Sequence, residues 1–479
     1  MAATPDDLRI RMYNVGFGDC FLLTFRYGGK KPFARHVLVD FGSTAAPEDR
    51  KSTMDAVAAL IKKDSDERLD AVIATHRHAD HISGFATRAD GMGSGDVIRS
   101  IAGNALVIQP WTEDPDLPTD AQAPLSAARA ASRALNALHV KSLEAMGDVA
   151  RSIVHRAGVL EQEATEGDAD EETQTAPRGQ AFIPELGVGK ELTKRLAFLG
   201  ETNLKNSSAV KNLQSMSPRR EFLSYGAKTG LAGDVLPGVK VHVLGPPTIR
   251  QHEQMLKQRP KDAAEYWHLQ AMATRITPEL TVEKLFPNEP AVQADMLPKP
   301  ARWFVRGLKA IQADQMHELV RIVDSTLNNT SLILLLEVGG KLLLFPGDAQ
   351  IENWEYALKF AKNAEANVEL LSRTEVYKVG HHGSLNATPK SLWQHFGNKP
   401  KLITLMSTRH GKHGKTTSQT EVPRTTLVKM LKAESDLHST VNLKGKGEAS
   451  LCDEVVIAFR NAKKPKPAPP PPAIAPELQ

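Results

Sequence analysis

The sequence predicts an α/β fold in which buried strands end at acidic and histidine side chains. Roughly the first forty residues contain three strand-like segments, and a helical segment follows them. A fourth strand-like segment, Leu69–Thr75, then runs directly into a histidine-rich loop. Strand, helix, strand and ligand-bearing loop is the order typical of an α/β protein with a site at the carboxyl end of a strand.

The expected elements are short and separated by turn residues. The first three strands are predicted at Ile10–Val15, Phe21–Phe25 and His36–Asp40. A helix is predicted over Pro47–Leu60, because Met54, Val57, Ala58 and Ile61 fall on one helical face. Further along, the pattern predicts a strand at Val239–Leu244 and a hairpin at Ser331–Phe345 that turns at Gly339 and Gly340.

The composition is that of an ordinary globular protein. A chain of 479 residues can form one large domain with insertions, or two domains. Hydrophobic residues make up 41% and charged residues 24% of it. The net charge of +4 argues neither for nor against a nucleic-acid partner, since only a local basic surface bears on that question.

Cysteine content and the N-terminus predict a cytoplasmic protein. Cys20 and Cys452 are too few for a disulfide framework, and a reducing compartment is the simplest interpretation. The N-terminal segment has no basic region followed by an apolar run, so no signal peptide is expected. The longest apolar candidate, Leu332–Phe345, is interrupted by Glu337 and Lys341, and no membrane association is predicted.

Composition also changes along the chain, which predicts a core split by two helical insertions. An acidic run within the first insertion, Glu161–Thr175, has few large apolar residues and is expected to be a mobile loop. Either insertion could offer a surface to a protein partner. The predicted parts are the first half of the core (1–112), the first insertion (113–236), a core strand (237–250), the second insertion (251–327), the second half of the core (328–460) and a disordered Pro/Lys-rich tail (461–479).

The loop after the strand at Leu69–Thr75 contains the strongest chemical signal. His76, His78, Asp80 and His81 lie within six residues. Side chains with this spacing cannot all face one way on a regular strand or helix, so a loop is required. Imidazole and carboxylate groups suit zinc, and also manganese or iron. The alternative is a solvated polar loop that binds no metal ion.

Two later strands also end at potential ligands. Leu342–Phe345 is followed by Gly347 and Asp348, a carboxylate that could bridge two metal ions, although most such aspartates cap a helix. A strand ending at Val379 is followed by His381 and His382, which by themselves are compatible with a structural or a functional role.

The order of these segments and their residue patterns resemble those of the metallo-β-lactamase superfamily. Within it they resemble the branch that includes the nuclease-like domain of DNA-uptake competence proteins and the teichoic-acid phosphorylcholine esterases. The matching segments are Asn14–Cys20, Val39–Gly42, His76–His81, Asn328–Leu332, Gly347–Asp348 and His381–Ser384. The resemblance implies an αββα sandwich for the core segments, about half of the chain, and leaves the two helical insertions unaccounted for.

The resemblance also implies a binuclear site for two divalent ions, zinc or manganese. His76 and His78 would bind the first ion, Asp80 and His81 the second, and Asp348 would bridge them. One histidine of the His381–His382 pair would complete the second site. His382 is favoured, with His381 beside the reacting group, so that Asp80 and His381 are the expected catalytic residues. No middle histidine ligand is expected, since His242 lies in a strand pattern and is predicted to be a core residue.

Further residues are assigned on the same basis. Asp40 is expected to orient a ligand histidine. Asp19 could belong to the site or to a turn. The candidate substrate contacts, each with a structural role as its alternative, are Arg77, Asn329, Ser384 and Asn386.

The leading functional prediction is phosphodiester hydrolysis, as a nuclease on DNA or RNA, by a hydroxide that bridges the two metals. A late basic cluster would bind phosphates or is simply a solvated loop; it contains Arg409, His410, Lys412, His413 and Lys415. One alternative is hydrolysis of a cyclic nucleotide, a phosphocholine ester or a lactone. A third is a partner-binding scaffold with a secondary metal site. A β-lactamase proper is not expected, since it would need a signal peptide.

Overall fold

A computed structural model describes most of the predicted core and little of the predicted insertions. The described residues are 4–50, 53–117, 123–124, 182–183, 188–189, 206–252, 328–384, 386, 388–412, 421–443 and 447–459. The predicted mobile loop at Glu161–Thr175, the predicted tail and nearly all of the second insertion lie outside these residues.

The first sheet has seven strands in the order β15-β1-β2-β3-β4-β5-β8. Its strands are β1 (Asp7–Tyr13), β2 (Cys20–Tyr27), β3 (Phe33–Phe41), β4 (Ala71–Ile73), β5 (Leu106–Pro110), β8 (Arg220–Leu223) and β15 (Cys452–Ala458). Strands β3, β4, β5 and β8 run parallel, whereas β1 pairs antiparallel with β2 and β15. The carboxyl ends of β3 and β4 therefore open on the same edge.

The second sheet has six strands in the order β14-β13-β12-β11-β10-β9. Its strands are β9 (Val239–Gly245), β10 (Ile333–Val338), β11 (Lys341–Phe345), β12 (Thr374–Lys378), β13 (Ile403–Met406) and β14 (Asp436–Ser439). The hairpin of β10 and β11 turns at Gly339 and Gly340, as predicted. Strands β11 to β14 are parallel, so the ligand segments after β11 and β12 also share one edge. A separate two-stranded sheet pairs β6 (Phe182–Ile183) with β7 (Val188–Gly189).

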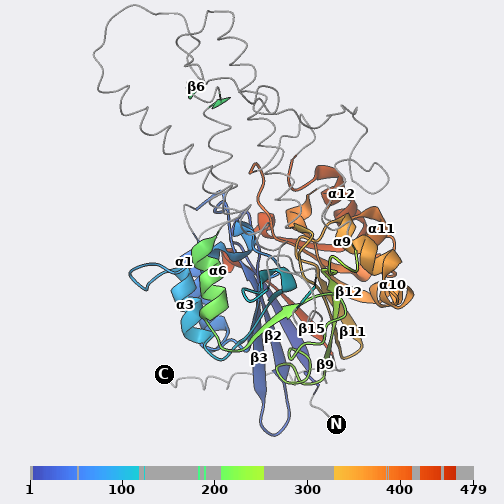
Figure 1. Ribbon diagram of the computed structural model, residues 1–479, viewed down its shortest axis with the longest axis horizontal. Coiled ribbons are helices and arrows are strands. Elements are labelled where there is room, and N and C mark those ends of the chain that lie inside the picture. Colours follow the sequence, from blue (N-terminus) through green and yellow to red (C-terminus); the bar gives the residue numbers. More distant parts are fainter. Residues whose placement is uncertain are drawn as a thin grey trace, which may run out of the picture.

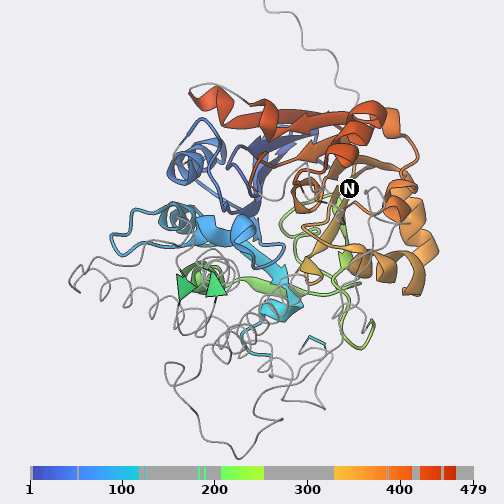
Figure 2. The same ribbon diagram turned by 90° about the horizontal axis from the view of Figure 1, so that it is seen from above.

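Helices cover the outer faces of both sheets (Figures 1 and 2). The first sheet is covered by α1 (Met54–Asp64), α3 (Ser94–Ile101) and α6 (Ser207–Ser215). The second is covered by α9 (Ile351–Glu355), α10 (Ala364–Ser372), α11 (Lys390–Trp393) and α12 (Thr425–Glu434), with a π-helical turn at Tyr356–Phe360. A short helix, α2 (Ala79–Ile82), carries two of the predicted ligands.

Apolar side chains from the two sheets pack together between them. Phe21 of β2 meets Phe345 of β11 edge to face, with ring centroids 6.1 Å apart. Strands β2, β5 and β11 are buried along nearly their whole length, because helices cover the outer faces of the sheets and the two sheets cover each other's inner faces. The architecture is the predicted αββα sandwich, and no helix among the described residues has the length and apolar character needed to cross a bilayer.

Helix α1 and strand β8 differ from the sequence-based expectation. Helix α1 begins at Met54, not at Pro47, and extends to Asp64, and it buries Val57, Ala58, Leu60 and Ile61. Strand β8 lies inside the range predicted as the first insertion, yet it forms the edge of the first sheet beside β5. Its sequence, Arg-Glu-Phe-Leu, buries little apolar surface and gives no strong strand signal.

Candidate metal centre

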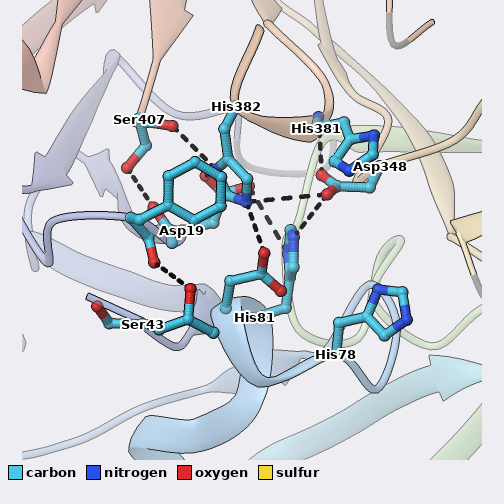
Figure 3. Close-up of polar contacts among 12 residues, drawn as sticks. Asp19, Ser43, His78, His81, Asp348, His381, His382 and Ser407 are labelled. Carbon is cyan, nitrogen blue, oxygen red and sulfur yellow. Dashed lines mark hydrogen bonds and ion pairs between the residues drawn. The ribbon is translucent and has the colours of Figure 1, made fainter. Parts of the chain in front are cut away.

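The predicted ligands gather where the carboxyl ends of both sheets meet. The loop after β4 supplies His76 to His81, β11 leads into Asp348, and β12 leads into His381 and His382. Figure 3 shows His81, Asp348 and His382 converging on one point. Because the ligands come from both sheets, the packing of the sandwich holds their relative positions.

Four of these side chains form a compact cluster. Asp80, His81, Asp348 and His382 each offer one ligand atom, and these atoms lie within 4.8 Å of one another. The Nε2 atom of His81 lies 3.0 Å from Asp348 Oδ2. The Nε2 atom of His382 lies 3.1 Å from Asp80 Oδ2. This set is the one that the resemblance implied for the second metal.

Each clustered histidine has a buried carboxylate behind it. Asp40 Oδ2 lies 2.9 Å from His81 Nδ1, on the side of the ring away from Asp348. Asp19 Oδ1 lies 3.5 Å from His382 Nδ1, which also lies 3.0 Å from the Ser407 carbonyl oxygen. Partners at Nδ1 fix the ring orientation and leave Nε2 to face the cluster. Asp40 thus contacts a candidate ligand histidine, and Asp19 does the same for the other.

His76 and His78 form a second pair in the same loop, and the His76 ring also lies beside that of His81, with ring centroids 4.1 Å apart. Their Nε2 and Nδ1 atoms are 3.0 Å apart. Among the described residues, no third His, Cys, Asp or Glu lies with them in a group as compact as the four-residue cluster. Burial lowers the pKa of His76 well below its usual value, and the neighbouring His81 and His78 lower it further, so its imidazole is neutral. A neutral imidazole is the form that binds a metal ion.

Backbone strain is concentrated at the residues that build the cluster. Asp40, His381 and His382 adopt φ values of 55°, 44° and 52°, which residues with a Cβ atom rarely adopt. Gly347 precedes Asp348 at φ 56°, and a Cβ atom there would lie 2.8 Å from that of Thr75. Such conformations persist only where the surrounding structure enforces them.

The cluster carries strongly shifted ionisation equilibria. Burial opposes charge on His382, but Asp19 and Asp348 outweigh it and raise its pKa to about 10. Burial likewise opposes ionisation of Asp348, while His81 and Lys378 hold its pKa well below the usual range. Without a metal, protons on His81 and His382 balance these carboxylates. A divalent cation would take over that role and release the protons.

The donor set fits a divalent transition metal. Two imidazoles and two carboxylates suit zinc or manganese. Asp80 Oδ1 is buried and has no hydrogen-bond partner among the described residues, which is the condition of an oxygen that awaits a cation. A second group, Asp19, Asp40 and His81, is less suitable, since Asp19 is already paired with Lys378 and Asp40 accepts two bonds from Thr75.

A family comparison agrees with this centre. Residues 14–87 match the family model of the metallo-beta-lactamase superfamily. The matched segment contains Asp19, Asp40 and the whole His76–His81 loop. The two-sheet α/β sandwich is the fold of this superfamily, and with the His/Asp cluster the match indicates a metal-dependent hydrolase. Comparison with curated proteins gives no match.

The candidate substrate residues lie in less open positions than the sequence implied. Arg77 Nε lies 3.4 Å from the buried Glu113 carboxylate. Asn329 is fully buried and donates to Glu352 Oε2 at 3.3 Å. Ser384 donates to Asn386 Oδ1 at 3.1 Å. Contact of these residues with a substrate stays a prediction.

The prediction that His242 is a core residue was wrong. It lies on β9 as expected, but its side chain is 31% exposed and pairs with Glu337 of β10 at 3.1 Å. The strand pattern alone did not establish which neighbours flank it.

Lys378 was not identified from the sequence as part of the site, because a lysine that ends a strand is usually solvated.

Proposed function

We propose that this protein is a binuclear metal-dependent phosphodiesterase that acts as a nuclease on DNA or RNA. The observation that supports a phosphate substrate is the position of basic residues beside the cluster. Lys412 is half-buried, and Asp80 and Arg409 are charged groups near enough to influence it. Burial, with a smaller effect from Arg409, lowers the pKa of Lys412. A positive charge kept on Lys412, despite the free-energy cost of its partial burial, suits an anion bound at the metal centre.

The ligands divide between two ions in this proposal. Asp80, His81, Asp348 and His382 would hold one ion, and His76 and His78 would hold the other together with Asp348. Bound divalent ions supply a nucleophile at neutral pH and stabilise charge that develops on the phosphoryl oxygens. The rings of His76 and His78 are buried and adjacent, which favours the binding of one ion by both.

The chain's own residues would position the substrate around this centre. His381 is half-buried, whereas His382 is fully buried, so His381 is the histidine of the pair that a substrate can approach. Its backbone N–H donates to Asp348 Oδ1 at 2.8 Å, which places it directly beside the cluster. We assign His381 to proton transfer at the leaving oxygen and Lys412 with Arg409 to the non-reacting phosphate oxygens.

The test is hydrolysis by the purified full-length chain. Metal content is measured first, and the chain is then incubated with supercoiled plasmid, single-stranded DNA, RNA and bis-p-nitrophenyl phosphate in zinc or manganese. Cleavage of a nucleic acid that is lost in Asp348→Ala supports the proposal. Hydrolysis of bis-p-nitrophenyl phosphate without cleavage of any of the nucleic acids would assign the same centre to a small substrate.

A further inference from the structure

Lys378 is a buried lysine in contact with the candidate metal centre. It is the last residue of β12, and its side chain is only 3% exposed. Its ammonium group forms ion pairs with Asp19 and with Asp348 Oδ1, the latter at 3.3 Å. It also donates to the Gly347 carbonyl oxygen at 3.0 Å. A buried ammonium persists only where such partners offset its desolvation.

The two carboxylate oxygens of Asp348 have different partners, and Lys378 contacts only one of them. Oδ1 accepts the His381 backbone N–H at 2.8 Å and faces Lys378. Oδ2 faces the cluster, 3.0 Å from His81 Nε2. Two donors on Oδ1 select one orientation of the carboxylate, and in that orientation Oδ2 is presented to a metal.

Lys378 also joins the two sheets at this edge. Asp19 precedes β2 of the first sheet, whereas Lys378 is the last residue of β12 and Asp348 follows β11, both in the second sheet. Asp19 in turn faces His382 Nδ1 at 3.5 Å. A single cation therefore contacts the carboxylate behind one ligand histidine and the ligand carboxylate itself.

We propose that Lys378 is a positioning residue that acts as a built-in counter-cation, holding Asp348 and Asp19 in place in the metal-free chain until a metal ion takes over its charge at Asp348. This inference rests on the proposed metal-dependent function. Its consequence is specific to the metal-free state. Without Lys378, Asp348 and Asp19 would lose a shared cation, and an entering metal would restore much of that lost charge balance for Asp348.

The experiment compares melting temperatures of the full-length chain after chelation and with zinc alone. In Lys378→Met, the melting temperature of the metal-free chain is expected to fall by about 10 °C. That of the zinc-bound chain is expected to fall by less than half as much, so the shift produced by zinc grows. A residue that serves only packing would lower both values equally.

Two further variants keep the result interpretable. Leu23→Ala, in the core between the sheets, is the matched control and should lower both melting temperatures without changing the zinc shift. The double variant Asp19→Asn with Lys378→Met removes both members of one buried pair and should fold even if the single variant does not. Its zinc shift should also exceed that of the wild type.

The outcomes separate this inference from the proposed function. A zinc shift unchanged from the wild type in both Lys378 variants overturns the role of Lys378, while zinc uptake by the wild type leaves the metal centre intact. No zinc uptake by the wild type overturns both. A larger zinc shift in the Lys378 variants than in Leu23→Ala supports the role of Lys378.

Discussion

The two halves of the candidate metal centre differ in how they are built. Asp80, His81, Asp348 and His382 come from both sheets and lie within 4.8 Å of one another. His76 and His78 come from one loop of the first sheet and contact each other at 3.0 Å. The first half is held by the packing of the whole sandwich and by buried carboxylates behind its histidines. The second is held by a single loop.

This difference suggests an order of binding. A site whose ligands are already in place binds a metal with little reorganisation. The pair His76 and His78 must gain at least one more ligand, for which Asp348 is the candidate. We therefore expect the four-residue half to bind the tighter ion, and the pair to bind the weaker one.

The largest effect is expected for Asp348→Ala, because Asp348 is the ligand proposed for both halves. Hydrolysis of bis-p-nitrophenyl phosphate should fall by about 1,000-fold or more. Metal content should also fall, since the carboxylate that offsets the mutual repulsion of two cations is lost.

The fold should survive this substitution. Lys378 keeps Asp19 as a partner, and the strand before Asp348 buries Leu342 and Leu344 regardless. Only a modest fall in melting temperature is therefore expected. A variant that keeps full metal content and activity would show that Asp348 caps a turn and that the site belongs to another carboxylate.

The next prediction separates the two halves directly. His382→Ala should remove the tighter zinc, because it deletes one of four clustered ligands and leaves Asp80 without its partner at 3.1 Å. His78→Ala should leave about one zinc per chain after dialysis, since the four-residue half is complete without it. Metal analysis of both variants gives the test. Equal losses would mean that the two ions bind as one cooperative unit.

Sequence reasoning singled out the four clustered residues as candidate ligands because their signals are local, and metal binding by them stays a prediction. Each candidate ligand lies in the loop or short helix that comes after a buried apolar strand, and the ends of such strands can be recognised in a single sequence. The hairpin at Gly339 and Gly340 was predicted for the same reason. The helical start of α1 was not, because its position depends on which side chains the first sheet accepts for burial.

The parts that escaped prediction all depend on contacts between distant segments. Lys378 meets Asp19 only when the two sheets pack together. Arg77 meets Glu113 only because β4 and β5 are neighbours. His242 of β9 pairs with Glu337 of β10, which lies diagonally across from it, because Leu335 is the residue directly opposite. Long-range charge pairing leaves no periodic signal in a single sequence.

A smaller effect on activity should distinguish the basic residues around the centre, Lys412 and Arg77, from the metal ligands. Lys412→Ala should leave metal content unchanged and raise KM for phosphodiesters by about tenfold, the loss of one charge-assisted contact. Arg77→Ala should also leave metal content unchanged, but it leaves the buried Glu113 without its cation. Its main effect should therefore be a lower melting temperature. Loss of metal in Lys412→Ala would contradict this division.

The smallest effect concerns a histidine–carboxylate pair outside the centre, which serves as a reference for the pair of His81 and Asp40. His438 of β14 lies 3.0 Å from Asp453 of β15 and 3.7 Å from Asp436, so it links the edge strands of the two sheets. Its side chain is 28% exposed. The hydrogen bond to Asp453 raises the pKa of His438, although burial opposes it.

A raised pKa in the folded state fixes the direction of the pH dependence. The stabilising contribution of His438 is fully present below its unfolded pKa of about 6.5 and is lost as pH rises through the higher folded pKa. Partial exposure limits it to less than about 1 kcal/mol. Urea unfolding of the metal-free chain at pH 6 and pH 9 should therefore show a larger loss of stability in the wild type than in Asp453→Asn. Identical losses in the two chains would show that this pair contributes nothing to the free energy of unfolding. A contact between a histidine and a carboxylate would then stabilise this protein only where both side chains are fully buried.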